Sequence, residues 1–190
     1  MSGAEVRLVR PAREHLSAYA DALKRGWSPD NVRGKAAADE QLARIGQDPD
    51  AFLASLDDPE ARGAPVKLPD GSEVRRLPGI VRWIRTDGFC GSIGFRWEPG
   101  TPALPPHVLG HIGFAVVPWQ QRRGIATRAL ALMLEEPRRL GLPHIEITTT
   151  PDNLASRRVI EANVGALVEH FEKEAAYGGG DALRFRIALI

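Results

Sequence analysis

The chain of 190 residues is 43% hydrophobic and carries a formal net charge of +1 at pH 7. This length and composition suit a single domain over residues 1–190 with a sizeable core. The near-neutral charge excludes a general nucleic-acid-binding surface, which needs a clear basic excess. A single cysteine, Cys90, excludes an internal disulfide. No apolar run approaches the roughly 20 residues of a membrane span, and the N-terminus lacks a signal-peptide core. We therefore expect a cytoplasmic protein without a membrane partner.

The N-terminal part of the chain predicts a strand followed by a helix. Apolar residues alternate loosely over 5–9, which indicates an edge strand. From 12 to 24 apolar residues recur at helical spacing, and Pro11 suits the first turn of a helix. This pattern predicts an amphipathic helix that packs on a sheet.

Residues 27–79 predict an elaboration of the domain rather than part of its sheet. Two short helices are expected at 36–45 and 49–56, and Asp48 is placed to cap the second. Glycine and proline are dense over 63–79, which indicates a turn-rich connector. The residues leave open whether this elaboration is a lid, a wall of a substrate site or neither.

A β-hairpin and a third strand come next. Residues 80–85 and 89–97 alternate in the manner of strands, and Asp87-Gly88 is a typical hairpin turn between them. A proline-rich loop then leads to a strongly apolar strand at 109–117.

The C-terminal part predicts two helices among three strands. An apolar stripe runs from 124 towards 140, but Pro137 removes a backbone hydrogen bond and predicts a kink or an early end near Glu136. The remaining elements are a strand at 145–150, a helix at 153–162 and strands at 165–171 and 183–189. The whole order predicts an α/β fold of the α+β type, with a mixed, mostly antiparallel central sheet flanked by helices.

The turn that opens the helix at residue 124 has the features of an anion site. The first amides of a helix have no intrahelical partner and lie at the positive end of its dipole. Gly124 and Ala126 allow a ligand to approach the backbone, and Arg122 and Arg123 add positive charge. This arrangement after an apolar strand predicts a diphosphate site.

Two motifs resemble those of the GNAT superfamily of N-acetyltransferases. The first is Phe114-x-Val116-x-Pro118-x-x-Gln121-Arg122-Arg123-Gly124-Ile125-Ala126, which is similar to the segment that wraps the pyrophosphate of acetyl-CoA. The second is Asp152-Asn153-x-x-Ser156, one helix and one strand further on, which resembles the second cofactor segment. The resemblance covers about 80–189 and is closest to uncharacterised bacterial members. It is looser to the members that acetylate ribosomal-protein N-termini.

The resemblance implies acetyl-CoA as co-substrate, without a metal. It would bind where the expected strand at 109–117, here called the cradle strand, splays from the next strand. The implied contact residues are Phe114, Val116, Val117, Gln121, Arg122, Arg123, Gly124, Ile125, Ala126, Thr127, Asn153 and Ser156. For Arg122 and Arg123, a solvated surface turn is the alternative. For Asn153, the alternative is a helix N-cap that touches no ligand.

Direct acetyl transfer needs a group that accepts the proton of the amine and a donor for the oxyanion. His111, at the start of the cradle strand, is the first candidate for the base, and its alternative is a polar residue at a strand start. His107 and Glu98 are the second candidates. The backbone amide of Val116 or Val117 is expected to polarise the carbonyl.

The sequence departs from the family pattern at two positions. Ile160 stands where many members have a tyrosine that protonates the leaving thiolate. Ser156, water or Tyr177 from the glycine-rich loop are the substitutes that remain. Val164 stands before Gly165 where glycine is common, and we expect this change to alter packing only.

These features predict an N-acetyltransferase that transfers an acetyl group from acetyl-CoA to a primary amine by direct attack. The acceptor is either a small-molecule amine or a protein or peptide N-terminus. The alternative is a non-catalytic module that binds or senses acyl-CoA, which the missing tyrosine favours. The acidic segment 48–60 is either an attractant for a cationic acceptor or a solvated face. The resemblance also suggests a homodimer through the last strands.

Overall fold

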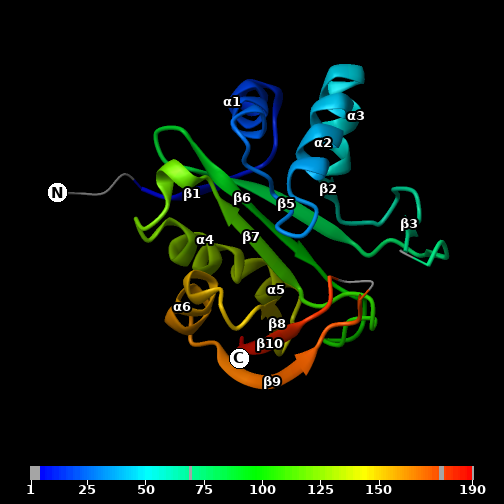
Figure 1. The fold of residues 1–190 in the computed structure, drawn as a ribbon, viewed down its shortest axis with the longest axis vertical. Helices are drawn as coiled ribbons and strands as arrows, with labels where there is room; N and C mark the ends of the chain where they lie inside the picture. The colour runs from blue at the N-terminus through cyan, green and yellow to red at the C-terminus, as the bar shows by residue number, and fades with distance from the viewer. Residues whose placement is uncertain (1–4, 69, 176–177, 190) are drawn as a thin grey trace.

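The computed structural model describes residues 5–68, 70–175 and 178–189. Figure 1 shows a large sheet that crosses the centre of the molecule and a second, smaller sheet beside it. In spatial order the first sheet contains β1 (Arg7–Val9), β5 (Gly79–Arg85), β6 (Phe89–Arg96) and β7 (Ile112–Val116), with β2 (Asp57–Asp58) also paired to β5. The second contains β8 (His144–Thr149), β10 (Asp181–Ala188) and β9 (Ala166–Glu172). A separate two-stranded ribbon pairs β3 (Val66–Lys67) with β4 (Glu73–Val74).

Helices cover both faces of the first sheet. Helices α1 (Arg13–Lys24), α2 (Lys35–Gln47) and α3 (Pro49–Ser55) lie on one face (Figure 1). The other face carries α4 (Ile125–Met133), α5 (Glu135–Arg139) and α6 (Leu154–Ala162), and a 3-10 turn, η1 (Pro118–Gln120), precedes α4. Within the described ranges, no helix is both long enough and apolar enough to cross a bilayer.

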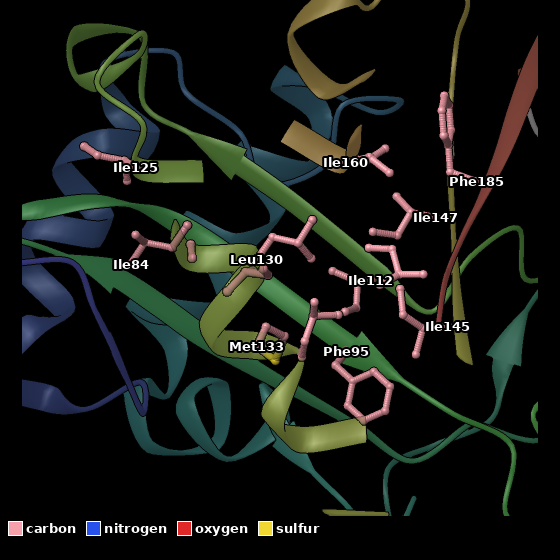
Figure 2. Packing of buried hydrophobic residues seen from close by; sticks show 14 of the residues in the cluster. Ile84, Phe95, Ile112, Ile125, Leu130, Met133, Ile145, Ile147, Ile160 and Phe185 are labelled. Atoms are coloured by element: carbon pink, nitrogen blue, oxygen red, sulfur yellow. The ribbon is translucent and has the colours of Figure 1, made fainter. Parts of the chain in front are cut away.

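Alternation along β5 divides the hydrophobic core between the two faces. Ile80 and Ile84 of β5 belong to the cluster that contains residues of α4 and of the second sheet, and Figure 2 shows this cluster from Ile84 to Phe185. On the opposite face, Trp83 stacks on Tyr19 of α1 with 4.8 Å between ring centroids. Because successive side chains of a strand point to opposite faces, one short strand contributes to both clusters.

The fold class predicted from the sequence is confirmed. Each predicted helix and strand is present within a few residues of its expected bounds, and Asp48 caps α3 by accepting hydrogen bonds from the amides of Asp50 and Ala51. The expectation of a mixed sheet needs refinement, because every ladder between the described residues is antiparallel. The connector at 63–79 also contains more structure than expected, namely β3 and β4.

The long helix predicted from 124 to 140 is interrupted as Pro137 requires. Helix α4 ends at Met133 and α5 begins at Glu135, so the break lies at Leu134, slightly earlier than predicted. Pro137 cannot donate a hydrogen bond to the carbonyl one turn earlier, and the helix restarts rather than continuing through that position.

Val164 affects the backbone, and the expectation that it alters packing only is wrong. It lies two residues after the end of α6 with φ of +62° and is 85% exposed. Its amide donates to the Glu161 carbonyl and the Gly165 amide donates to the Ile160 carbonyl, which completes a left-handed helix end. A β-branched residue is strained in this conformation, where glycine is normal.

Val164→Gly is expected to raise the free energy of unfolding by about 1 kcal/mol, because it removes the left-handed strain. Urea denaturation of the purified variant measures this change. Val168→Gly is the matched control, since Val168 is also exposed but lies in strand β9. That variant should lose stability, and a similar loss in Val164→Gly would contradict the assignment of strain.

Candidate functional site

The first feature of the site is the separation of β7 from β8. No ladder joins the two strands in the described part of the chain, although both belong to the central layer. They meet just before β7, where the His111 amide donates to the Glu146 carbonyl at 2.8 Å. Gly110 allows this contact, because a β carbon there would lie 3.2 Å from the Glu146 carbonyl oxygen. Beyond this point β7 has an edge that no strand of the described ranges covers.

The register of β7 decides which of its backbone groups face that free edge. Val117 donates its amide to the Cys90 carbonyl of β6 at 2.9 Å. In an antiparallel pair, alternate residues direct both backbone groups to the same neighbour. Phe114 and Val116 therefore direct theirs away from β6, into the gap. Val117 is fully buried and its amide is already bonded, so of the two predicted oxyanion donors the structure leaves only the Val116 amide free.

The second feature is a run of amides at the start of α4 that have no partner among the described residues. Gly124 is the N-cap with φ of +72°, and no side chain caps the helix. The first amide of this turn with a backbone partner is that of Arg128, which donates to Gly124. Arg122 is also left-handed, with φ of +62°. Left-handed residues in a turn create concave groups of amides that bind anions, and the cost of this backbone points to a function.

The side chains around this turn stabilise its shape. Gln121 donates from Nε2 to the Val116 carbonyl at 3.2 Å, and Arg123 is hydrogen-bonded to Gln120. Trp119 lies beneath the guanidinium of Arg25, the C-cap of α1, whose Cζ is 3.4 Å from the centroid of the Trp119 ring. Ile125 is buried in the core, so only its amide is available for a ligand. These residues position the amides of 122–127, and none of the turn's side chains fills the space at Gly124.

Helix α6 lies beside α4 but does not bring Asn153 to the turn at 122–127. The side chain of Asn163, at the far end of α6, donates to the Thr127 carbonyl at 3.2 Å. Asn153 is at the other end of the nine-residue helix, roughly 15 Å from Asn163 at the usual rise. There its side chain accepts the Ser156 amide at 3.0 Å, which is the N-cap interaction expected from the sequence. Sequence reasoning missed Asn163, because a single polar residue after a helix carries no distinguishing pattern.

His111 is buried, with 1% of its surface exposed. Its Nδ1 accepts the Glu146 amide at 2.9 Å, so the neutral ring carries its proton on Nε2, which is buried without a partner among the described residues. Burial lowers its pKa to about 4, and the negative charge of Glu146 opposes this shift only in part. In this tautomer neither nitrogen has a free lone pair.

The candidates for the general acid also have defined positions, with one exception. Ile160 is fully buried in the core and has no polar atom to offer. Ser156 lies in the first turn of α6. Tyr177 lies outside the described residues.

The third feature is a cavity of about 550 Å³ on the face that α1 to α3 cover. Ser92, Gly94 and Gly113 form its floor, and their small size keeps the space open. Residues of the segment 27–79 form one wall, so this elaboration borders a cavity. His107, from the proline-rich loop, also lines it. Glu98 instead forms an ion pair with Arg75.

No group of three or more metal-ligating side chains is present in the residues that the structure describes. Cys90 is buried, and its sulfur lies 3.4 Å from the Thr86 hydroxyl, consistent with a small core residue.

The comparison that decides the family matches residues 31–163 to the model of the acetyltransferase (GNAT) domain. The chain belongs to this GNAT family. The match includes β5 to α6, and therefore the free edge of β7, the amides at the start of α4 and the cap of α6. No curated protein sequence matches the chain.

Solved acetyltransferase structures share the fold of this GNAT domain. Mycobacterium smegmatis RimJ in complex with CoA-disulfide has a TM-score of 0.65 and 20% identity over 96% of this chain and 81% of its own. The Salmonella typhimurium acetyltransferase that modifies the N-terminal serine of ribosomal protein L7/L12 has a TM-score of 0.64 and 15% identity over 98% of this chain and 96% of its own. The microcin C7 self-immunity acetyltransferase MccE, solved with acetyl-CoA and AMP, has a TM-score of 0.59 and 14% identity over 98% of this chain and 93% of its own.

Proposed function

We propose that this GNAT protein transfers an acetyl group from acetyl-CoA to a primary amine by direct attack. The observation that carries the proposal is the free edge of β7, which ends at a turn whose amides from 122 to 127 have no described partner. The diphosphate fits these amides, because they offer donors at the positive end of α4. The amide groups of the pantetheine arm fit the backbone N–H and C=O of Phe114, which face the gap, whereas Gln121 occupies the carbonyl of Val116.

The separation of Asn153 from the turn agrees with an extended ligand. In acetyl-CoA the diphosphate and the thioester lie at opposite ends of the pantetheine arm. We assign the turn to the diphosphate, and we assign Asn153 and Ser156 to the region of the arm nearer the thioester. The Asn153 Oδ1 is committed to the helix cap, so its Nδ2 is the group that remains for a ligand.

Acetyl-CoA supplies the activated acyl group, and the residues of this chain position the reactants. The Val116 amide is placed to donate to the carbonyl oxygen, where negative charge develops as the amine attacks. No covalent intermediate on the protein is required. We assign protonation of the leaving thiolate to solvent or to the Ser156 hydroxyl, because the buried Ile160 supplies no proton.

We propose that His107 accepts the proton of the amine and that His111 positions β7 against β8. His107 lines the cavity, whereas both nitrogens of His111 are unavailable in the tautomer that its hydrogen bond to the Glu146 amide requires. A base must reach the amine directly or through one water molecule, and a residue in the cavity wall can do so.

The acceptor enters through the cavity, whose volume is typical of a small-molecule site. A protein N-terminus is the second candidate, supported by the related fold of the enzyme that modifies ribosomal protein L7/L12. A non-catalytic acyl-CoA sensor is the alternative function, which the absence of a tyrosine at Ile160 favours.

Release of free thiol from acetyl-CoA, measured with a panel of amines and peptides, tests the proposed function. At least one primary amine should give saturable release. His107→Gln should lower the rate at saturating substrates by about 100-fold, the scale of general-base catalysis, without changing acetyl-CoA affinity. His170→Gln is the control, because His170 is exposed on β9. Binding of acetyl-CoA with no release for any amine would support the sensor, and full activity of His107→Gln would place the base elsewhere.

A further inference from the structure

The cavity contains more positive than negative side chains. Arg75, Arg76 and Arg96 line it, and Asp58 is the one carboxylate among its described lining residues. Arg75 is paired with Glu98. Arg76 donates from Nε to the Ala64 carbonyl at 2.9 Å. These two arginines are therefore held by partners in the protein, while the third is not.

Arg96 ends β6 and extends over the floor of the cavity. Its Nη2 lies 3.9 Å from the position that a β carbon would take at Gly113 of β7. Across the described ranges its guanidinium has neither a hydrogen bond nor an ion pair. Arg96 is exposed to solvent, although the protein atoms around its guanidinium lower its pKa and the charge of Asp30 opposes this shift. The Asp30 carboxylate already accepts the amides of Val32 and Arg33.

Each carboxylate of the acidic segment 48–60 has a partner other than Arg96. Their partners are the amides of α3 for Asp48, Arg13 for Asp50, Arg10 and Arg82 for Asp57, the Arg62 and Gly63 amides for Asp58, and Arg62 for Glu60. The interpretation of this segment as an attractant for a cationic acceptor therefore rests on carboxylates that already have partners in the protein.

We propose that the acceptor is a small amine that also carries an anionic oxygen group, a carboxylate or a phosphate, which Arg96 binds in the cavity. This proposal rests on the proposed acetyltransferase function. A guanidinium that has no described hydrogen-bond or ion-pair partner is available to a charged acceptor, which can bind it through two parallel hydrogen bonds. Gly113, beneath Arg96, belongs to β7, so the anion is held next to the strand that is proposed to bind the thioester.

Matched pairs of amines in the thiol-release assay test this proposal. One arm compares amino acids with their amides, and the second compares aminoalkyl phosphates with the corresponding amino alcohols. In the wild-type protein the anionic member of at least one pair should have a kcat/KM at least 10-fold higher. Arg96→Gln should abolish that preference through KM, by about 10- to 100-fold for loss of a charge-assisted pair. The arm with the preference identifies the carboxylate or the phosphate.

Two further variants separate this effect from general damage. Arg75→Gln removes a cavity arginine whose charge is matched by Glu98, and it should change the preference by less than about 3-fold. Arg96→Glu should reverse the preference towards cationic amines such as polyamines. Calorimetry should give the same acetyl-CoA affinity for all three variants, since Arg96 and Arg75 lie outside the predicted cofactor residues.

Each outcome bears on the proposal. Equal kcat/KM for charged and neutral members, or a preference that survives in Arg96→Gln, would overturn it while leaving the transferase function intact. If no amine releases thiol from acetyl-CoA, the proposed transferase function fails. The role of Arg96 is then tested by calorimetry, which measures binding of the same amine pairs to the acetyl-CoA-loaded protein. Binding of the anionic members that Arg96→Gln removes would support it, and charge-independent binding would overturn it.

Discussion

Gly124→Trp is expected to raise the Kd of acetyl-CoA by at least about 100-fold, because it blocks several amide contacts with a charged group, each worth about 1.5–3 kcal/mol. A β carbon at Gly124 meets no atom of the protein within 4 Å, so the side chain would occupy the space in front of the amides. Isothermal titration calorimetry measures the change directly.

Gly141→Trp is the matched control for this substitution. Gly141 has φ of +71°, against +72° for Gly124, and it also has open space around its β-carbon position. Both variants should lose the same small amount of stability from left-handed strain. Only Gly124→Trp should lose affinity for acetyl-CoA, and retained affinity would refute the diphosphate assignment.

His111→Ala is expected to lower the free energy of unfolding by about 2–4 kcal/mol, because it leaves a buried amide without an acceptor and creates a cavity in the core. The amide concerned is that of Glu146, which loses its acceptor when the imidazole is removed. His111→Asn should recover part of the loss, because its side-chain oxygen can replace Nδ1. Urea denaturation at pH 7 ranks the three proteins, and equal stability of the alanine and asparagine variants would contradict this role of Nδ1.

The pH dependence of stability should also identify His111. Its pKa falls from the ordinary 6.5 to about 4 on folding, so between these values the unfolded chain binds more protons. Stability from this group is complete above pH 6.5 and is lost as the pH falls towards 4, by up to about 3 kcal/mol. Protonation of Nδ1 would place its N–H against the N–H of Glu146, so the hydrogen bond between them would be lost.

The pH dependence has its own control. His111→Asn should have a shallower fall in stability between pH 7 and 4, whereas the exposed His170→Asn should retain the wild-type slope. Denaturation curves at several pH values measure both slopes, and identical slopes for wild type and His111→Asn would argue against titration of His111.

Local features of the sequence were enough to predict most elements and the turn that opens α4. Asp48 caps its helix, Pro137 interrupts one, and Gly124 adopts the left-handed conformation at the N-cap of α4. Each of these depends on a residue and its near neighbours, which is the range over which propensity and capping act. The spacing of the acetyl-CoA motif is likewise local, and the family match confirms the membership that it indicated.

The tertiary structure decided which of these groups are free to act. Register with β6 leaves the Val116 amide free and uses that of Val117, although the two residues are adjacent and chemically identical. Contact with Glu146, 35 residues away, occupies the Nδ1 of His111. Arg96 was not distinguished from the other arginines until the fold placed it over Gly113 without a partner. In each case the availability of a polar group depends on partners that are distant in the chain, and only the folded backbone brings these together.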